Sequence, residues 1–329
     1  MRKVLVTLGL LLLIIACKKD DESVEIVPPR FLSEVAPEDD AEIRAFLDSH
    51  FYNYEEFENP PANFDYRIIL DTLAGDNSDK RPLSEFVQSR TALVNSFEFT
   101  LDYEENDIEH TYYYFTARDG EGPQPSVADS VFVRYKGQLL NGNTFDQVAN
   151  GGVWFDLAQI QAPLQGFRGF TEGMQHFKTG GTPVVNNDGT FSVENYGVGM
   201  FIFPSGLGAF SSLSAKIPQY APLIFQVDLL TYNPTDHDGD GIPSIQEDLN
   251  GNGYLYDDNT DADYENEINS NLFADFLDTD DDGDGYRTRL EITFDQEGNL
   301  VFLDTDNDGV FDHLDADSWP ASAEEEDEN

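Results

Sequence analysis

The segment from Val131 to Asp146 constrains the fold more than any other part of the chain. Val131–Leu140 is rich in β-branched and aromatic residues, and Asn141-Gly142 follows it, a dipeptide that favours a tight hairpin turn. Thr144-Phe145 then begins a second strand. We therefore expect antiparallel β structure, in a chain whose 40% hydrophobic content can supply a core.

Neighbouring segments extend this pattern. Tyr112–Phe115, Met200–Phe203 and Leu223–Leu230 have the composition of further strands. Between them the apolar spacing becomes helical, which predicts a short helix over Gly166–Lys178 that ends at Gly180-Gly181. The predicted fold class is α+β, with an antiparallel sheet wrapped on one short helix over residues 109–233.

The N-terminal part carries a second set of signals. Asp39 with Glu42 forms a capping-box pattern, and apolar residues then recur at helical spacing, which predicts a helix over residues 40–55. Apolar and polar residues alternate from Phe97 to Tyr103, which predicts a half-buried strand. The five histidines lack metal-ligand spacing, and we expect His176 on the exposed side of its helix.

Four segments together resemble the FKBP-type peptidyl-prolyl isomerases. They are VFVRYKGQLLNGNTFD from Val131, GFRGFTEGMQ from Gly166, FIFPSGLG from Phe201 and LIFQVDLL from Leu223. The resemblance implies prolyl isomerisation without a cofactor, with proline-containing protein segments as substrates. It also implies a pocket formed by Tyr135, Phe145, Asp146, Phe155, Phe167, Phe170, Ile217 and Phe225.

The sequence departs from this family pattern at three places. Phe170 stands where the family usually has tryptophan, Val153 where an aromatic residue is common, and Ala209 where a tyrosine commonly donates a hydrogen bond. Taken singly, the aromatic residues would be ordinary core. A second hypothesis is therefore a surface module whose degenerate pocket holds a peptide without isomerising it.

Residues 234–319 are rich in Asp, Asn and Gly, and they repeat the spacing D-x-D-x-D-G-x5-E, which places carboxylates around one hard cation. The expected calcium ligands include one backbone carbonyl in each copy. They are Asp236, Asp238, Asp240, Ile242 and Glu247; Asp280, Asp282, Asp284, Tyr286 and Glu291; and Asp304, Asp306, Asp308, Val310 and Asp315.

Other features of this tail leave alternatives open. A weaker fourth copy begins at Asp248 and has Asn250 and Asn252 in place of aspartates. The copies resemble EF-hand loops in ligand spacing, but without evident flanking helices they look more like thrombospondin type-3 repeats. An acidic disordered tail is the alternative, although disorder would not preserve the spacing of ligands.

The N-terminus predicts a lipid anchor. A basic start and a short apolar run lead to Ala16-Cys17, an ending that resembles the lipobox of bacterial lipoproteins, with Cys17 as the acylated residue. An ordinary signal peptide with an incidental cysteine is the alternative. We expect an outer-membrane lipoprotein, either periplasmic or surface-exposed.

Charge and composition complete the predicted organisation. A formal charge of −46 repels phosphate backbones and argues against a nucleic-acid partner. The predicted segments are 1–17 signal peptide and lipobox, 18–37 linker, 38–108 N-terminal extension, 109–233 isomerase-like domain, 234–319 calcium repeats and 320–329 acidic tail.

Overall fold

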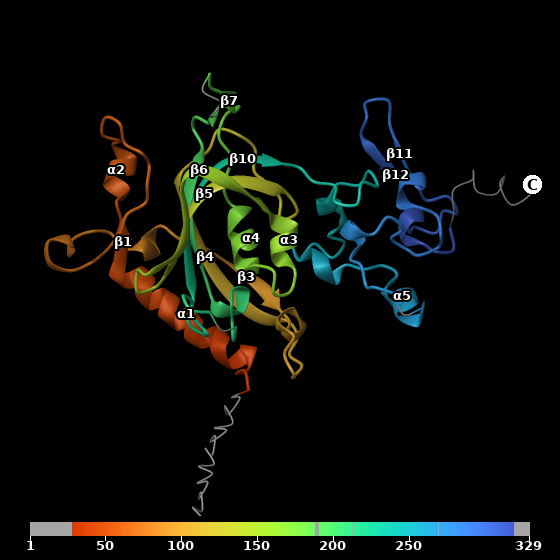
Figure 1. Ribbon diagram of the computed structural model, residues 1–329, viewed down its shortest axis with the longest axis horizontal. Coiled ribbons are helices and arrows are strands. Elements are labelled where there is room, and N and C mark those ends of the chain that lie inside the picture. The colour runs from red at the N-terminus through yellow and green to blue at the C-terminus, as the bar shows by residue number, and fades with distance from the viewer. Residues whose placement is uncertain (1–27, 188–190, 213, 269, 319–329) are drawn as a thin grey trace, which may run out of the picture.

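The computed structural model of the chain describes residues 28–187, 191–212, 214–268 and 270–318 (Figure 1). The lipobox with Cys17, residues 18–27 of the predicted linker and the predicted acidic tail lie outside the described residues. Among the residues that the structure does describe, no helix combines the length and the apolar character needed to cross a membrane.

A six-stranded antiparallel sheet forms the centre of the molecule. The Asn141-Gly142 hairpin joins two of its strands as predicted, with Gly142 at a φ of +84°, in the left-handed region that such a turn requires. In spatial order the strands are β3 (Gln88–Val94), β4 (Ile108–Arg118), β9 (Gly197–Phe203), β10 (Leu223–Asn233), β5 (Ser130–Leu139) and β6 (Thr144–Asp156).

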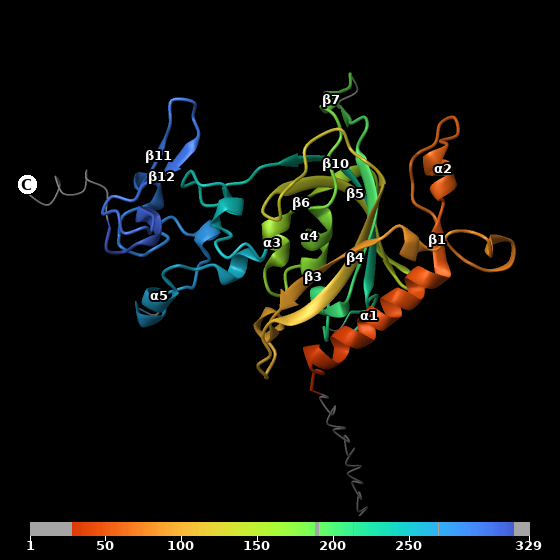
Figure 2. The same cartoon turned by 180° about the vertical axis from the view of Figure 1, so that it is seen from behind.

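Both faces of this sheet are covered, because the side chains of β4 and β9 alternate between two buried clusters. Tyr112 and Phe201 face a cluster that includes Phe170 of α4 (Arg168–Met174). Tyr113 and Met200 face the opposite cluster, which contains the second half of α1 (Leu32–Ser49). Figures 1 and 2 show α4 and α3 (Leu157–Gln161) on one side of the sheet and α1 on the other.

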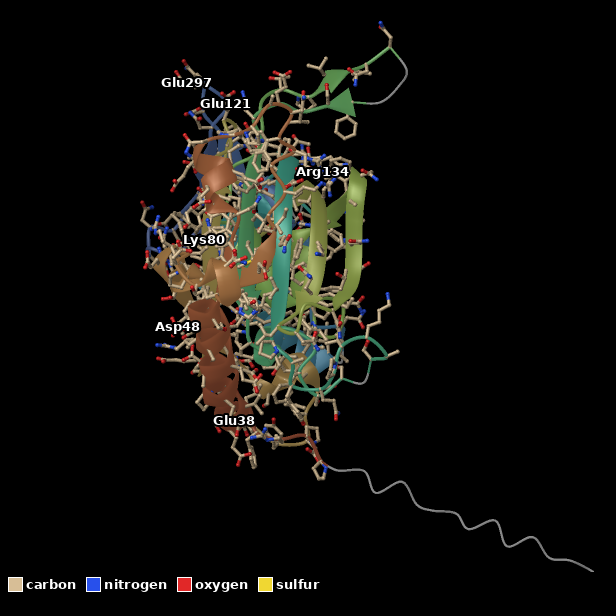
Figure 3. All side chains as sticks on the ribbon, turned by 90° about the vertical axis from the view of Figure 1, so that its left-hand side faces the viewer. Glu38, Asp48, Lys80, Glu121, Arg134 and Glu297 are labelled. Atoms are coloured by element: carbon tan, nitrogen blue, oxygen red, sulfur yellow. The ribbon has the colours of Figure 1, made fainter. Side chains whose placement is uncertain are left out.

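The helix predicted over residues 40–55 begins and ends earlier than expected. Helix α1 starts at Leu32, because Leu32 and Val35 are fully buried and extend the apolar stripe toward the N-terminus. The predicted linker therefore ends before residue 37, and Asp39 lies inside the helix instead of capping it. Glu38 and Asp48 on the outer face of α1 are exposed (Figure 3).

The prediction of a strand from Phe97 to Tyr103 is wrong. Residues Ser96–Phe99 form a 3₁₀ turn that ends at Thr100, which has a left-handed φ of +52°. The turn reverses the expected burial, since Phe97 is 48% exposed and Glu98 only 5%. Residues 88–94 of the predicted N-terminal extension form β3 and so complete the central sheet.

The remaining elements are short. Beyond Asn233 the chain consists mainly of loops and 3₁₀ turns, and it lies beside α3 at the far side from α2 (Figure 1). The short elements before Asn233 are β1 (His50–Tyr52), α2 (Tyr54–Glu58), β2 (Leu70–Thr72), β7 (Val184–Val185) and β8 (Phe191–Ser192). Those after it are α5 (Ala262–Ile268), β11 (Ile292–Phe294) and β12 (Leu300–Phe302).

Candidate functional site

A cavity of about 450 Å³ opens between the sheet, α4 and the loops that follow α3 and β9. Its size lies within the range of small-molecule and peptide side-chain pockets. Seven of the eight residues that the family resemblance indicated line it. These are Tyr135, Asp146, Phe155, Phe167, Phe170, Ile217 and Phe225.

Aromatic rings form the floor and walls of this cavity. Phe170 of α4 lies edge-on to Phe155 and Phe225, with ring centroids 5.1 Å apart in both pairs. Phe170 and Phe225 are buried, whereas Phe155 and Phe167 are half-buried and keep part of their surface toward the opening. An apolar side chain that enters the cavity would therefore meet ring faces and edges on several sides.

Phe145 is the indicated residue that does not line the cavity. Its ring is buried behind the wall, 5.5 Å from the ring of Phe225, and close to Gly137 of the neighbouring strand. A side chain at Gly137 would collide with it. Phe145 supports the pocket wall from behind, so its place in the site is structural.

One polar pair reaches into this apolar space. The hydroxyl of Tyr135 donates a 2.6 Å hydrogen bond to Oδ2 of Asp146. Burial, together with the neighbouring carboxylate, raises the pKa of Tyr135 well above its usual range, so the hydroxyl stays protonated as a donor. Asp146 itself is exposed and lines the cavity.

The rim contains residues that pattern analysis did not indicate. Ile160 of α3 and the following Pro163 and Leu164 form an apolar lip, and Leu164 is 62% exposed. Ala209 lines the opposite side, where the family resemblance suggested a missing tyrosine. Pro163, Leu164 and Ala209 lie in loops and Ile160 lies in α3, and together their side chains form no periodic pattern that a sequence could reveal.

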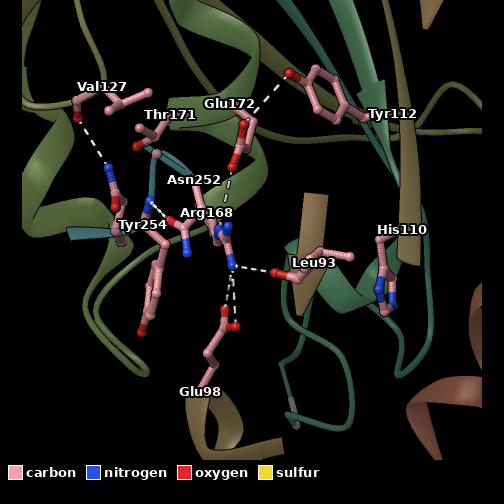
Figure 4. Close-up of polar contacts among 12 residues, drawn as sticks. Leu93, Glu98, His110, Tyr112, Val127, Arg168, Thr171, Glu172, Asn252 and Tyr254 are labelled. Atoms are coloured by element: carbon pink, nitrogen blue, oxygen red, sulfur yellow. Dashed lines mark hydrogen bonds and ion pairs between the residues drawn. The ribbon is translucent and has the colours of Figure 1, made fainter. Parts of the chain in front are cut away.

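A buried ionic network closes the cavity on the side of α4 (Figure 4). Nη1 of Arg168 donates to the carbonyl of Leu93 at 2.7 Å and to Glu98 at 3.1 Å, and Nε donates to Glu172 at 3.3 Å. Burial raises the pKa values of both glutamates, and Arg168 opposes that effect. Arg168 and Glu98 also line the cavity, so one of its walls is charged but internally paired.

His176 belongs to this network and is not on an exposed helix face. Its ring stacks on Tyr114 with centroids 3.7 Å apart, and Nε2 lies 2.9 Å from the hydroxyl of Tyr112. Burial lowers the pKa of His176 to about 4. The expectation failed because α4 ends at Met174, so the helical spacing does not extend to residue 176.

The tail contacts the pocket through α3 and Arg168. The ring of Tyr254 is fully buried and lies 4.5 Å from the guanidinium carbon of Arg168. The backbone nitrogen of Leu255 donates to Oε1 of Gln161, a residue that also lines the cavity. A small apolar cluster joins the two parts, made of Ala128, Ala158, Leu255, Ala274 and Phe276.

The Asp-rich loops share one local geometry. In the first loop the nitrogen of Gly241 donates to Asp236, and in the second the nitrogen of Gly285 donates to Asp280, both at 3.2 Å. Gly241, Gly285 and Gly309 have left-handed φ values of 96° to 108°, which explains the glycine of the repeat. Ile242, Tyr286 and Val310 follow these glycines, and each donates its N–H to the aspartate two residues earlier.

The glutamates that close the first two loops are buried. Glu247 is 2% exposed and Glu291 0% exposed, and within the described residues none of their carboxylate oxygens has a hydrogen-bond partner. Burial and neighbouring aspartates raise the pKa of Glu247 to about 10 and that of Glu291 to about 9. Such oxygen-lined sites fit a hard cation, which would neutralise the carboxylates.

The loops differ in which ligands they bring together. Asp238, Asp240 and Glu247 gather in the first loop, Asp280, Asp282 and Asp284 in the second, and Asp304, Asp306 and Asp308 in the third. The predicted ligands Asp236, Glu291 and Asp315 lie outside these groups. Asp236 instead holds the turn through Gly239 and Gly241, and Asp315 accepts from Asp317.

Comparison with known proteins identifies two regions of the chain. Residues 122–230 match the family of FKBP-type peptidyl-prolyl cis-trans isomerases, and residues 237–303 match the family described as BamM C-terminal. The middle third of the chain therefore matches the FKBP-type peptidyl-prolyl cis-trans isomerase family.

Individual relatives each match about a third of the chain. A probable FKBP-type isomerase, FkpA of Neisseria meningitidis, is 36% identical over 113 residues, which are 33% of this chain and 39% of that protein. FK506-binding protein 1 of Dictyostelium discoideum is 29% identical over 35% of this chain and 92% of its own length. The structure of FkpA from Escherichia coli has 26% identity, covers 37% of this chain and 48% of its own, and gives a TM-score of 0.28.

Proposed function

We propose that this protein catalyses cis-trans isomerisation of X-Pro bonds in the cavity beside α4. The observation that carries the proposal is an aromatic pocket of about 450 Å³ with the hydrogen-bonded pair Tyr135 and Asp146 in its lining. The match of residues 122–230 to the FKBP-type family supports it.

The physical barrier explains why such a pocket suffices. Rotation about an X-Pro bond loses amide resonance and costs roughly 18–20 kcal/mol. Water stabilises the planar, charge-separated amide, so transfer into an aromatic cavity removes an advantage of the ground state. Phe155, Phe170 and Phe225 would hold the prolyl ring, and the hydroxyl of Tyr135 would orient the peptide or stabilise the twisted bond.

Conservative variants of the polar pair test this proposal. Tyr135→Phe and Asp146→Asn keep the shape of the side chains but remove the hydroxyl or the charge. Loss of one hydrogen bond to a charged group costs about 1.5–3 kcal/mol, so kcat/KM for a proline peptide should fall about 10- to 100-fold. Tyr264→Phe, at a 48% exposed position in the tail, is the matched control and should have full activity.

The same assay separates catalysis from peptide holding. Ala209 lies at the rim in place of the tyrosine of the family pattern. This replacement favours the second hypothesis, in which the pocket binds a peptide without isomerising it. In that case the wild-type protein would bind a proline peptide, and peptide exchange spectra would show no acceleration. If Tyr135→Phe and Asp146→Asn fold and keep full activity, neither side chain contributes to catalysis.

We propose further that the protein is a lipoprotein whose substrates are proline-containing segments of envelope or exported proteins. The Ala16-Cys17 ending after a short apolar run supports acylation at Cys17. Cys17→Ala should abolish incorporation of labelled palmitate and move the protein from the membrane fraction to the soluble fraction. Unchanged labelling would contradict the anchor.

For the tail we propose calcium binding in the three loops that begin at Asp236, Asp280 and Asp304. The buried glutamates and the left-handed glycines support this proposal, because they match what a Ca²⁺ loop requires. Calorimetric titration of the chelator-stripped full chain should give saturable Ca²⁺ binding. Absence of binding would contradict it and would leave the prolyl isomerase proposal untouched.

A further inference from the structure

The second residue of each Asp-rich loop has an equivalent backbone contact. In all three loops its backbone nitrogen is held in the same way, by the side chain seven residues later. His237 donates to Ser244 at 3.1 Å, Asp281 to Thr288 at 3.1 Å and Thr305 to Asp312 at 2.7 Å. The loops are therefore equivalent at this position, and only the identity of the side chain differs.

That side chain connects the first loop to the isomerase domain and the second loop to the first. Nε2 of His237 lies 3.1 Å from Oδ2 of Asp156, at the end of β6. The carboxylate of Asp281 instead joins Asp238, Asp240 and Glu247 of the first loop, with one oxygen from each residue within 4.8 Å of the others. Asp281 was not among the ligands that the repeat spacing indicated, because it is not at a ligand position of its own loop.

The carboxylate of Asp281 is buried without protein partners. Asp281 is 1% exposed and Glu247 2% exposed. Across the part of the chain that the structure describes, both oxygens of each residue lack a hydrogen-bond donor, as do Oδ2 of Asp238 and Oδ2 of Asp240. Four carboxylates gathered in this way repel one another, and ionised groups are rarely buried unless paired or bound to metal.

We propose that Asp238, Asp240, Glu247 and Asp281 together bind one hard divalent cation of the Ca²⁺ class, which locks the second loop onto the first. This inference rests on the proposed calcium binding of the tail and adds a ligand from outside the linear repeat. Ca²⁺ accepts six to eight oxygens in flexible geometry, and carboxylates bind it through one or both oxygens. Mg²⁺ fits less well, because it retains several waters and requires a near-ideal octahedron.

A consequence is that calcium would order the tail outward from the isomerase domain. The first loop is attached to β6 through His237, and its ion would fix the second loop through Asp281. A repeat unit with no apolar core of its own would thus be linked to the next one by a shared ligand.

Calcium titration of charge variants in the full chain tests the shared site. Asp281→Asn should weaken one class of Ca²⁺ site about 10-fold or more, and Glu247→Gln should weaken that same class. The double variant should lose less affinity than the product of the two single losses, because both side chains bind one ion. The double variant Asp281→Asn with Glu291→Gln should weaken two separate classes of Ca²⁺ site.

Asp263→Asn is the matched control, since Asp263 is exposed on α5 in the same part of the chain. The inference is overturned if Asp281→Asn titrates like this control, or if it weakens only the class that Glu291→Gln weakens. If the wild-type tail binds no calcium, the calcium proposal itself fails, and the two failures are distinguishable.

A crystal structure of the wild-type protein with Ca²⁺ removes any dependence on the folding of variants. An ion at the first loop should have an Asp281 oxygen within about 2.3–2.6 Å. An ion bound there by Asp238, Asp240 and Glu247, with Asp281 outside this distance, would contradict the shared site.

Discussion

The isomerase domain and the tail both contain buried side chains, but of different kinds. In the domain, aromatic rings such as Phe170 and Phe225 are enclosed, and its buried charge network is paired, with Arg168 between Glu98 and Glu172. In the tail, Glu247 and Glu291 are enclosed as carboxylates that lack protein donors among the described residues. The two regions therefore differ in whether protein groups pair their buried charges within the described residues.

This contrast distinguishes two kinds of burial with opposite effects on stability. Burial of an aromatic side chain is favourable by itself, whereas burial of a carboxylate is unfavourable until its charge is neutralised. Phe276 and Leu255 are buried in one cluster with Ala128 and Ala158 of the domain. This part of the tail therefore shares its apolar contacts with the domain, and the proposed calcium ions would neutralise its buried carboxylates.

Removal of divalent ions should have the largest effect. With a chelator in excess, we expect residues 236–317 to lose nearly all protection from amide hydrogen exchange, because repulsion among the carboxylates is no longer neutralised. The amides of the central sheet should keep their protection. Equal protection of the tail with and without chelator would contradict the contrast between the two regions.

Phe225→Ala should produce the next largest effect, this time inside the domain. Phe225 is 4% exposed and contacts the rings of Phe145, Phe170 and Phe203, so the variant leaves a cavity and should lower the free energy of unfolding by about 3–5 kcal/mol. Denaturant unfolding at saturating calcium measures it, with Phe225→Leu as the milder control. A loss below about 1 kcal/mol would show that the wall is not a packed core.

Tyr254 tests the attachment between the two regions. Tyr254→Ala removes a fully buried ring beside Arg168 and should cost about 2–4 kcal/mol, seen as faster exchange of the Leu255 amide that is bonded to Gln161. Tyr254→Phe should be neutral or slightly stabilising, since the hydroxyl has no hydrogen-bond partner in the described part of the chain. Equal effects of both variants would indicate that the hydroxyl, not the ring, makes the attachment.

A smaller, pH-dependent effect should come from Asp39 in α1. Its carboxylate is 3% exposed and accepts from the nitrogen and hydroxyl of Ser205, and burial raises its pKa to about 6. The folded state thus binds this proton more tightly than the unfolded state, so its stabilising contribution is complete below about pH 4 and is lost as the pH rises to about 6.

Asp39→Asn keeps an oxygen acceptor for Ser205 but does not ionise. Relative to wild type, we expect its free energy of unfolding to increase by about 2 kcal/mol between pH 4 and pH 7. Denaturant titrations at the two pH values measure this difference, and Asp40→Asn at the neighbouring residue is the control. A difference that does not change with pH would mean that Asp39 is ionised at little cost.

The sequence predicts the middle of the molecule better than its edges. Periodicity and turn chemistry give the strands around the Asn141-Gly142 hairpin, and the family resemblance indicates residues of the pocket wall. The alternation of apolar and polar residues around Phe97 gave a wrong prediction of a strand. It did so because the burial of Glu98 depends on Arg168, which is far away in the chain. A local pattern contains no information about such a partner.

The same limit applies to the tail. Spacing along the chain identifies ligands within one loop, so Asp238, Asp240 and Glu247 were predicted together. It cannot identify Asp281, whose position next to them depends on how the second loop folds onto the first. The prediction that Asp39 caps a helix failed for a related reason. Asp39 matches the capping pattern, but its carboxylate is buried inside α1 and accepts a hydrogen bond from Ser205.

Line-shape or exchange NMR of an X-Pro peptide with the wild-type protein tests the central claim most directly. We predict accelerated cis-trans exchange with a rate that is nearly constant from about pH 6 to pH 8, because the mechanism transfers no proton and the pKa values of Tyr135 and His176 lie far outside this range. Exchange at the uncatalysed rate with fully folded protein, or a steep titration near neutrality, would contradict it.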